Sequence, residues 1–448
     1  MKKLSLFLML IVLIHSFANS QHEISRIDSL VSAYVDQSDF TGTILVAKQG
    51  RILIEKAYGY SNTENENGDN PSTVYNIASL TKTFTAALIL KLQEMKKLSV
   101  SDNLARYFPG YPNGDKISLH QLLTHTAGIP DYLNDKNFSR ADQTKEISLD
   151  SMIAFFKDKP LEFEPGTRFR YSNSGYTLLG YIIEKVTGMP YGKALEHFIF
   201  KPLKMQHTSF GPPRQEKELA PGYNMYFKNF KLPSIVVHAS VSYATGAIYS
   251  TVEDLYKWDQ ALISGHFLSK ASLEAAYHKD KGPYGYGWFT DSLYGRLRVS
   301  HDGNIHGYKS NINRMPDDKV CVIALSNANN SSVGRMVRDV INILYHQPLS
   351  TPFTDVPVIS MPDSVKRIFA GTYTIRKEDS LRIVVRMNGA NLTVQVMNQP
   401  AFEIVPFARN QFRNGSTRVE FMLDNKNKPV QVMIYSKGEI WGAGKDPE

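Results

Sequence analysis

The stretch Ile77-Ala78-Ser79-Leu80-Thr81-Lys82-Thr83-Phe84 determines how the rest of the chain is interpreted. Apolar residues recur after it at helical spacing, so the sequence predicts a helix with Ser79 in its first turn. Ser79 and Lys82 then share one face of that helix. A serine hydroxyl becomes a nucleophile when a base lies within hydrogen-bonding distance, and a lysine kept neutral by burial is a suitable base. The free backbone N–H groups of a first turn also favour a developing oxyanion.

A serine with lysine three residues later is also common by chance, as a helix cap followed by a solvated charge. This chain has one such pair, and that pair opens an apolar helix. A catalytic interpretation therefore requires partner residues elsewhere in the chain.

The stretch Tyr171-Ser172-Asn173 supplies the first candidate partners. It lies on a short loop that enters a predicted helix over residues 176–186, where a side chain can point into a cleft. Three other tyrosines also have asparagine two residues later but lie at a strand end or in turns, namely Tyr60, Tyr111 and Tyr132. A tyrosine close to cations can exchange protons although its unperturbed pKa is about 10. Asn173 can hydrogen-bond both the Lys82 amine and a substrate amide.

The third candidate stretch is His301-Asp302-Gly303-Asn304, at the end of a predicted edge strand. Gly303 permits close approach of the backbone to a ligand. His301 can donate a hydrogen bond to the tyrosine oxygen or to a substrate. His125 is a further candidate base, but a structural histidine at a helix end is the favoured interpretation.

Residues 1–20 have the composition of a secretory signal peptide, with Lys2-Lys3, an apolar run over residues 4–14 and then Ala18-Asn19-Ser20. The apolar run is short for a membrane span, and an uncleaved N-terminal anchor is the alternative. No later stretch of the sequence is apolar for long enough to cross a membrane. We expect an exported protein, periplasmic or extracellular, with no membrane span after cleavage.

The composition fits an enzyme with a large core and more than one domain, since the 448 residues are 42% hydrophobic and 21% charged. The net charge of +8 is spread without the basic block typical of nucleic-acid binding, so we expect no nucleic-acid partner. The one cysteine, Cys321, lies in an apolar run and excludes an intrachain disulfide and a thiolate-rich metal site. The 12 histidines are scattered, and no metal is expected.

With these motifs in this order, the chain resembles the serine β-lactamase and penicillin-binding protein family. It is closest to the class C β-lactamase-related branch, which includes D-alanyl-D-alanine carboxypeptidases, D-amino-acid peptidases and esterases. The stretches around Ser79, Tyr171 and His301 carry the resemblance, which covers residues 24–345. It implies an α+β fold with a central antiparallel sheet flanked by helices, beside an all-helical subdomain, with the cleft between them.

The same resemblance implies a role for each motif residue. Ser79 would be the acylated nucleophile, and Lys82 and Tyr171 would share the roles of general base and proton shuttle. The resemblance leaves open which of the two is the principal base. The backbone N–H groups of Ser79 and Asn304 would form the oxyanion hole. No cofactor or metal is implied. The residues expected to bind the substrate are Asn173, His301, Asp302 and Gly303.

Asp302 departs from the family pattern, which commonly has threonine or serine in the middle of the third motif. In penicillin recognisers that hydroxyl helps to hold the ligand carboxylate. A carboxylate facing another at about 4 Å costs on the order of 1 kcal/mol in water and more at a buried site. Asp302 therefore either turns away and pairs with a cation such as Lys309, or selects against anionic ligands.

Residues 347–362 are predicted to be a linker because they contain four prolines. Beyond them, short alternating stretches separated by turns such as Asn388-Gly389 predict a small antiparallel barrel or sandwich. A structural covering role for this part is favoured over the binding of a ligand or partner. The predicted organisation is a signal peptide at 1–20, a hydrolase domain at 21–346, the linker at 347–362 and an all-β domain at 363–448.

The sequence thus predicts an exported serine hydrolase that acts through a covalent acyl-enzyme on a small ester, amide or short peptide. A true β-lactamase or D-alanyl-D-alanine carboxypeptidase is the alternative among enzymes. A non-catalytic binding protein on the same fold is the alternative outside them, and the presence of all the catalytic side chains argues against it. The oligomeric state stays open.

Overall fold

The computed structural model describes most of the chain, and the predicted signal peptide at 1–20 lies outside the described residues. Much of the predicted linker also lies outside them, so the predicted domain boundaries stay a prediction. The described residues are 21–35, 40–62, 67–68, 70–139, 141–213, 218–227, 230–329, 332–349, 358–374, 382–396, 401–414, 417–436 and 439–446.

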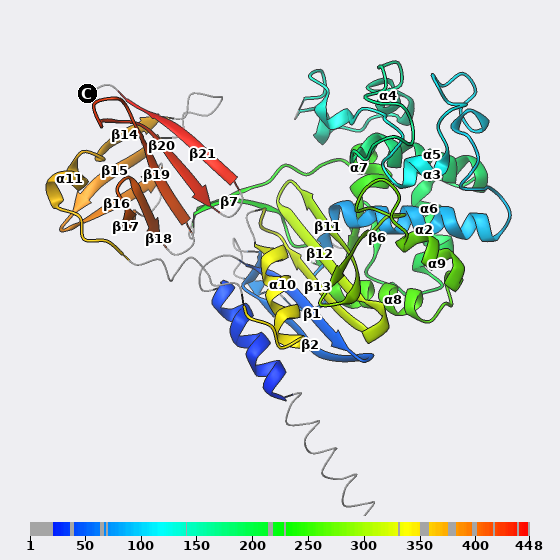
Figure 1. The fold of residues 1–448 in the computed structure, drawn as a ribbon, viewed down its shortest axis with the longest axis horizontal. Coiled ribbons are helices and arrows are strands. Elements are labelled where there is room, and N and C mark those ends of the chain that lie inside the picture. The colour runs from blue at the N-terminus through cyan, green and yellow to red at the C-terminus, as the bar shows by residue number, and fades with distance from the viewer. Residues whose placement is uncertain are drawn as a thin grey trace, which may run out of the picture.

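An antiparallel sheet of six strands lies at the centre of the larger part of the molecule (Figure 1). A strand from the start of the chain is inserted beside one from far along it, because Leu45 pairs with Ile323. The strands, in spatial order, are β10 (Phe289–Leu293), β11 (Arg296–Ile305), β12 (Tyr308–Met315), β13 (Val320–Ser326), β1 (Gly42–Lys48) and β2 (Arg51–Tyr58).

The middle strands β13 and β1 are buried on both faces of this sheet. In β1 successive side chains alternate between the two faces, as the strand period requires: Ile44 packs into one core and Leu45 into the other. The helix at 21–35 and α10 (Val333–Leu344) cover the first face, and α8 (Val252–Ile263) lies on the second. The stretch around His301 lies inside β11, which is the second strand of the sheet and continues to Ile305, so the prediction of an edge strand that ends there was wrong.

The predicted helical subdomain lies beside the sheet and carries the helix that follows Ser79 (Figure 1). That helix, α2, begins at Thr81, so Ser79 lies in the 3₁₀ turn η1 (Ala78–Leu80) directly before it and not in its first turn. The described helices of this part are α2 (Thr81–Glu94), α3 (Leu119–Leu123), α4 (Leu149–Ala154), α5 (Asn173–Thr187), α6 (Tyr191–Leu195), α7 (Ala239–Gly246) and α9 (Lys270–Tyr277).

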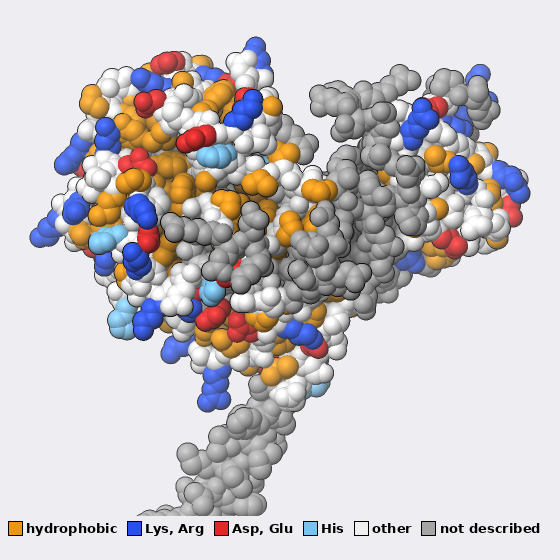
Figure 2. All heavy atoms as spheres, turned by 180° about the vertical axis from the view of Figure 1, so that it is seen from behind, with side chains coloured by type: hydrophobic (Ala, Val, Ile, Leu, Met, Phe, Trp, Pro, Cys, Tyr) orange, Lys and Arg blue, Asp and Glu red, His pale blue; other side chains and the backbone are white. Residues whose placement is uncertain are grey.

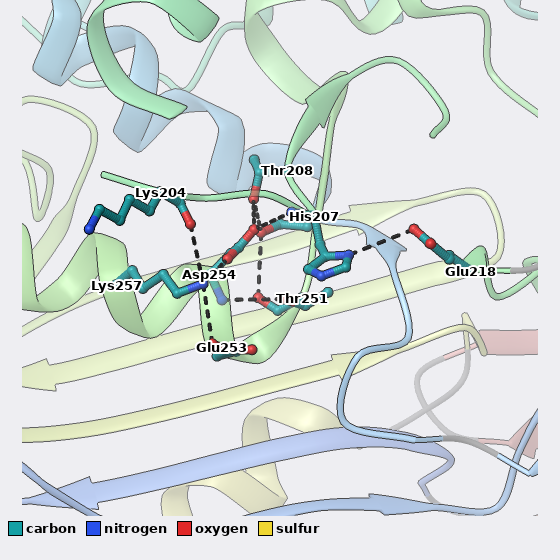
Figure 3. A network of polar contacts seen from close by, with 9 residues as sticks. Lys204, His207, Thr208, Glu218, Thr251, Glu253, Asp254 and Lys257 are labelled. Atoms are coloured by element: carbon teal, nitrogen blue, oxygen red, sulfur yellow. Dashed lines mark hydrogen bonds and ion pairs between the residues drawn. The ribbon is translucent and has the colours of Figure 1, made fainter. Parts of the chain in front are cut away.

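Asp254 is buried in the first turn of α8 and joins that helix to a distant loop (Figure 3). Its Oδ2 accepts hydrogen bonds from the backbone N–H of His207 at 2.7 Å and from the hydroxyl of Thr208 at 2.9 Å. Its Oδ1 accepts one from Lys257 at 2.7 Å, and Thr251 caps the helix. A buried carboxylate with this many donors holds both segments in place.

The loop joined in this way leads into a small sheet of three strands beneath Ser79. β9 (Ile248–Ser250) is the middle strand and pairs with β6 (Ser209–Phe210) on one side and β5 (Tyr75–Asn76) on the other. Because β5 ends three residues before Ser79, the Asp254 network and this sheet together fix where the serine stretch starts.

A buried ion pair connects α8 to the main sheet. The Arg314 Nε donates to Asp259 Oδ1 at 2.6 Å, and both side chains are at most 1% exposed. The guanidinium also donates to the Tyr277 hydroxyl and lies over the Trp288 ring. Removing one partner of such a pair destabilises the fold, because the other charge stays buried without compensation.

The C-terminal part is a closed antiparallel barrel with its own apolar core, which includes Phe412 and Phe421 (Figure 1). The structure thus confirms the predicted α+β fold class with a small all-β part and selects the barrel over the sandwich. Its strands are β14 (Gly371–Thr374), β15 (Arg382–Asn388), β16 (Asn391–Val396), β17 (Phe402–Ala408), β18 (Gln411–Asn414), β19 (Thr417–Leu423), β20 (Pro429–Ser436) and β21 (Glu439–Lys445).

The surface charge is dispersed. On the face in Figure 2, basic and acidic side chains are interspersed and no basic block stands out. Among the described residues, no helix has the length and apolar character that crossing a membrane requires. Cys321 is buried in β13, as the apolar run around it predicted.

Asp259→Ala should lower the free energy of unfolding by about 3–5 kcal/mol, because it leaves the Arg314 charge buried without its partner. Asp291→Ala is the matched control: Asp291 pairs with Arg298, but its side chain is 47% exposed. The Asp291→Ala control should lower the free energy of unfolding by about 1 kcal/mol or less. Urea unfolding of wild type and the two variants measures both losses. Equal losses would show that the buried ion pair contributes no more to stability than the exposed one.

Candidate active site

The turn that presents Ser79 has an unusual backbone. Ala78, directly before it, has a positive φ of 48°, which is uncommon for a residue with a side chain. The Asn76 side chain stabilises this turn by accepting a hydrogen bond from the Ala78 N–H at 2.7 Å. The backbone N–H of Ile77 donates to Ile248 O in β9 at 2.9 Å. Ser79 is thus held at a defined place, half-buried at the edge of a cleft.

Lys82 lies where the serine–lysine spacing predicted. Its Nζ donates to Ser79 Oγ at 3.0 Å and to the backbone oxygen of Thr245 at 2.9 Å. The whole side chain is buried, at 0% exposure. The predicted pair therefore forms, and a backbone carbonyl of α7 that the sequence did not reveal fixes the amine from the other side.

The environment of Lys82 favours its neutral form. Burial lowers the pKa of Lys82 to about 7, while the charges of Asp131 and Asp302 oppose that shift. An amine with such a pKa is largely unprotonated slightly above neutrality and can accept the proton of Ser79. The group within hydrogen-bonding distance of the serine is therefore also the group whose pKa suits a base.

Tyr171 lies on the loop before α5, as predicted from its context. Its ring is 4.9 Å from Lys82 Nζ and stacks on the His125 ring at 4.2 Å between centroids. Burial raises the pKa of Tyr171 well above its usual value, although the hydrogen bond between its hydroxyl and Ser79 lowers that pKa in part. The phenol is therefore a proton donor at neutral pH and not a phenolate.

His125 supports Tyr171 from behind. The ring is buried, and its Nδ1 accepts a hydrogen bond from the Ser172 N–H at 3.2 Å. Burial lowers the pKa of His125 well below its usual value, and the charge of Lys82 adds to the effect. These contacts agree with the structural interpretation of His125 and give it the task of positioning the tyrosine.

Asn173 is the first residue of α5 and lines the same cleft as Ser79. Its Nδ2 donates to Asp131 Oδ2 at 2.8 Å. Asp131 was not identified from the sequence: it follows Gly128-Ile129-Pro130, which predicts a turn, and nothing in that pattern separates it from other turn aspartates. Through its charge it raises the pKa of Lys82, so it belongs to the site electrostatically.

His301 occupies a different place from the one expected for a substrate contact. It is 2% exposed, its Nε2 is 2.8 Å from the Tyr284 hydroxyl, and its Nδ1 is 2.6 Å from the Asp302 carbonyl oxygen. Burial, with the charge of Lys82, lowers the pKa of His301 to about 3, so the ring is neutral. Both nitrogens meet protein partners, and a contact between His301 and a substrate stays a prediction.

Gly303 permits a close approach of the protein backbone, whereas its approach to a ligand stays a prediction. A Cβ at this position would lie 2.5 Å from Ile77 O and 2.2 Å from Ser310 Oγ. The absence of a side chain lets β11 pass directly beside the turn that carries Ser79. The next residue, Asn304, is exposed and lines the cleft together with Ser79.

Asp302 is exposed and lines a second cavity of about 670 Å³ on the outer side of β11 and β12. The ionised side chains around that cavity are Asp291, Asp302, Arg298, Lys309, Arg335 and Arg338. Four basic groups against two carboxylates leave the cavity positive, which argues against the hypothesis that Asp302 excludes anions. Whether Asp302 pairs with Lys309 stays a prediction.

The cleft that contains Ser79 has a volume of about 590 Å³. Tyr171, Asn173 and Asn304 line it with polar groups, and Leu133 and Val241 contribute apolar surface. None of its described lining residues is Lys, Arg, Asp or Glu. Lys82 lies beneath this surface and contacts Ser79 and Thr245, which both line it. No group of described residues in the chain is arranged to hold a metal ion.

A family model described as Beta-lactamase matches residues 27–345. Penicillin-binding protein 4* of Bacillus subtilis (strain 168) is 29% identical over 446 residues, covering 93% of this chain and 98% of that protein. The octameric penicillin-binding protein homologue from Pyrococcus abyssi has a TM-score of 0.65 at 24% identity, covering 94% and 98%. A D-stereospecific amidohydrolase from Streptomyces sp. has a TM-score of 0.60 at 26% identity, covering 72% and 97%.

Lys82→Met should raise the free energy of unfolding by about 1–3 kcal/mol at pH 7, because folding no longer buries an amine that is charged in the unfolded chain. The folded pKa lies below the unfolded value, so between the two the unfolded chain binds more protons and wild-type stability rises with pH. The gain of the variant should therefore shrink as the pH is raised from 7 to 10.

Urea unfolding at both pH values measures this difference. Lys91→Met on the same helix is the matched control, since Lys91 Nζ is half-buried and donates to Phe267 O at 2.8 Å. The control should not be stabilised at either pH. A Lys82 variant that is less stable than wild type at both pH values would contradict the argument.

Proposed function

Because the chain belongs to the β-lactamase family, as its three motifs predicted, we propose that it is an exported serine hydrolase. It forms a covalent acyl-enzyme on Ser79 from a small ester or amide. One observation carries this proposal: the Lys82 amine, with a pKa lowered to about 7, lies 3.0 Å from Ser79 Oγ beneath an open cleft.

The reaction begins with proton transfer from Ser79 Oγ to the neutral Lys82 amine while the oxygen attacks the substrate carbonyl. The backbone N–H groups of Ser79 and Asn304 stabilise the oxyanion. Collapse of the tetrahedral intermediate expels an alcohol or amine, which takes a proton from Tyr171, and Lys82 returns its proton to the phenol oxygen. Water then attacks the acyl-enzyme with the same groups in the reverse roles.

The division of labour between Lys82 and Tyr171 follows from their opposite pKa shifts. A base must be unprotonated at the working pH, and an acid must hold its proton. Burial lowers the pKa of Lys82 to about 7 and raises that of Tyr171 well above its usual value. Lys82 is therefore the base for acylation, and Tyr171 is the proton donor to the leaving group.

The substrate is an uncharged ester or amide. The absence of ionised groups from the described lining of the cleft supports this choice, because a charged substrate group would lose water there without a partner. The alternative of a β-lactamase or D-alanyl-D-alanine carboxypeptidase draws support from the penicillin-binding relative, and an amide substrate from the amidohydrolase. The positive cavity beside Asp302 is the feature that favours an anionic substrate.

Ser79→Ala should abolish acylation, with a loss of about 10³-fold or more in kcat/KM for p-nitrophenyl acetate. Intact-mass measurement after incubation with a fluorophosphonate should show one adduct on wild type and none on the variant. Incubation with a penicillin in parallel separates the lactamase alternative, which requires an adduct or turnover. An undiminished fluorophosphonate adduct in the variant would place the nucleophile elsewhere, and no adduct on wild type would favour the non-catalytic alternative.

Tyr171→Phe should slow acylation by roughly 10²–10⁴-fold, which is the usual contribution of a positioned acid–base group. Tyr111→Phe is the matched control, because Tyr111 also precedes an asparagine by two residues but does not line the cleft. Stopped-flow release of p-nitrophenol compares the two. Similar losses in both variants would show that Tyr171 has no special role.

The pH profile should follow Lys82. The value of kcat/KM for p-nitrophenyl acetate should rise with pH and level off, with a midpoint near the Lys82 pKa of about 7. Asp131→Asn should move that midpoint to lower pH, because the Asp131 charge opposes the lowering of the lysine pKa. Asp115→Asn, at an exposed turn outside the cleft, should leave it in place. A midpoint that is the same in all three proteins would refute the assignment of the base.

A further inference from the structure

Two side chains from opposite walls of the cleft meet across it. Gln143 belongs to the 3₁₀ turn η4 (Asp142–Thr144) of the helical part, and His306 follows β11 in the sheet part. The His306 Nε2 and Gln143 Oε1 are 3.0 Å apart. Since the amide oxygen can only accept, the imidazole donates. Both residues line the cleft that contains Ser79.

The wall that carries His306 is firmly placed. His306 and Gly307 form the two-residue turn between β11 and β12, in which Ile305 pairs with Tyr308. Gly307 has a φ of 79°, and a Cβ there would lie 2.8 Å from the Gly222 backbone. The turn therefore packs tightly on its neighbour, and the Tyr308 hydroxyl adds a hydrogen bond to Ala220 O at 2.7 Å.

The opposite wall is tied to the segment that holds the catalytic lysine. The backbone oxygen of Gln143 accepts a hydrogen bond from the His238 N–H at 2.8 Å, and the Ile147 N–H donates to Ser240 Oγ at 2.9 Å. His238 is the N-cap of α7, whose Thr245 oxygen accepts from Lys82. Gln143 thus has a fixed backbone, and its side chain completes the span to His306.

We propose that the Gln143–His306 hydrogen bond is a bridge that limits the size of the substrate. The cleft beneath it admits a small acyl group, which packs on Leu133 and Val241, and excludes a bulky one unless the bridge opens. This inference rests on the proposed hydrolase function. It makes Gln143 and His306 specificity-determining residues, with no part in the chemistry at Ser79.

The bridge predicts a change in selectivity. Gln143→Ala removes it and should raise kcat/KM for p-nitrophenyl diphenylacetate, relative to p-nitrophenyl acetate, by about tenfold, the scale of one lost hydrogen bond with its packing. Gln143→Glu keeps an acceptor oxygen and should retain the selectivity of wild type. Gln206→Ala, at an exposed glutamine outside the cleft, should also retain it.

A double-variant cycle separates a bridge from two independent effects. His306→Ala should change selectivity by about as much as Gln143→Ala, and the double variant should gain little more than either, because both remove the same contact. Additive gains, or an equal change for both esters, would overturn the bridge. So would a Gln143→Glu variant that behaves like Gln143→Ala.

Fluorophosphonate labelling of Ser79 in the same preparations distinguishes failure of this inference from failure of the proposed function. Wild type and all variants should be labelled, since the catalytic groups are untouched. Labelling with unchanged selectivity overturns the bridge alone, whereas absence of labelling in wild type overturns the hydrolase proposal together with the inference that depends on it.

Discussion

The burial of the Lys82 amine is the constraint on which the rest of the site depends. A lysine that must be neutral at working pH needs a dry environment, and a dry environment needs closely packed neighbours that still satisfy the amine. The Lys82 Nζ donates hydrogen bonds to Ser79 Oγ at 3.0 Å and to the Thr245 backbone oxygen at 2.9 Å. Asp131 and Asp302 keep the pKa from falling further. The lowered pKa of Lys82 thus results from a balance between desolvation and the charges of two carboxylates.

The need to hold Ser79 beside the buried Lys82 explains two unusual features of the backbone around the serine. The positive φ of Ala78 turns the chain so that Ser79 faces both the lysine and the cleft. The missing side chain of Gly303 lets β11 run directly against the same turn. Strain of this kind persists only where the surroundings hold it in place, and here the small β5-β9-β6 sheet and the Asp254 network do so.

The sequence predicted those features of the site that depend on local spacing. Ser79 and Lys82 are one helical turn apart, and Tyr171 stands on a loop before a helix, so both could be identified from the sequence. The partners brought together by tertiary folding could not: the Thr245 carbonyl lies 163 residues from Lys82, and Gln143 lies 163 residues from His306. The fold class followed from the same logic, because alternation and helical spacing are local, whereas closure of the C-terminal barrel depends on pairing between β14 and β21.

The third motif shows how one strand serves two environments. Residues two apart in a strand share a face, so His301 and Gly303 are both buried, the first against Tyr284 and the second against the serine turn, while Asp302 and Asn304 are exposed. The outward face opens on the positive cavity, and only Asn304 also borders the uncharged cleft. A carboxylate placed there raises the pKa of Lys82 through its charge and does not line the cleft that contains Ser79. Asp302, which stands where the family pattern has a hydroxyl, therefore affects the pKa of the candidate base Lys82, while its contact with a substrate stays a prediction.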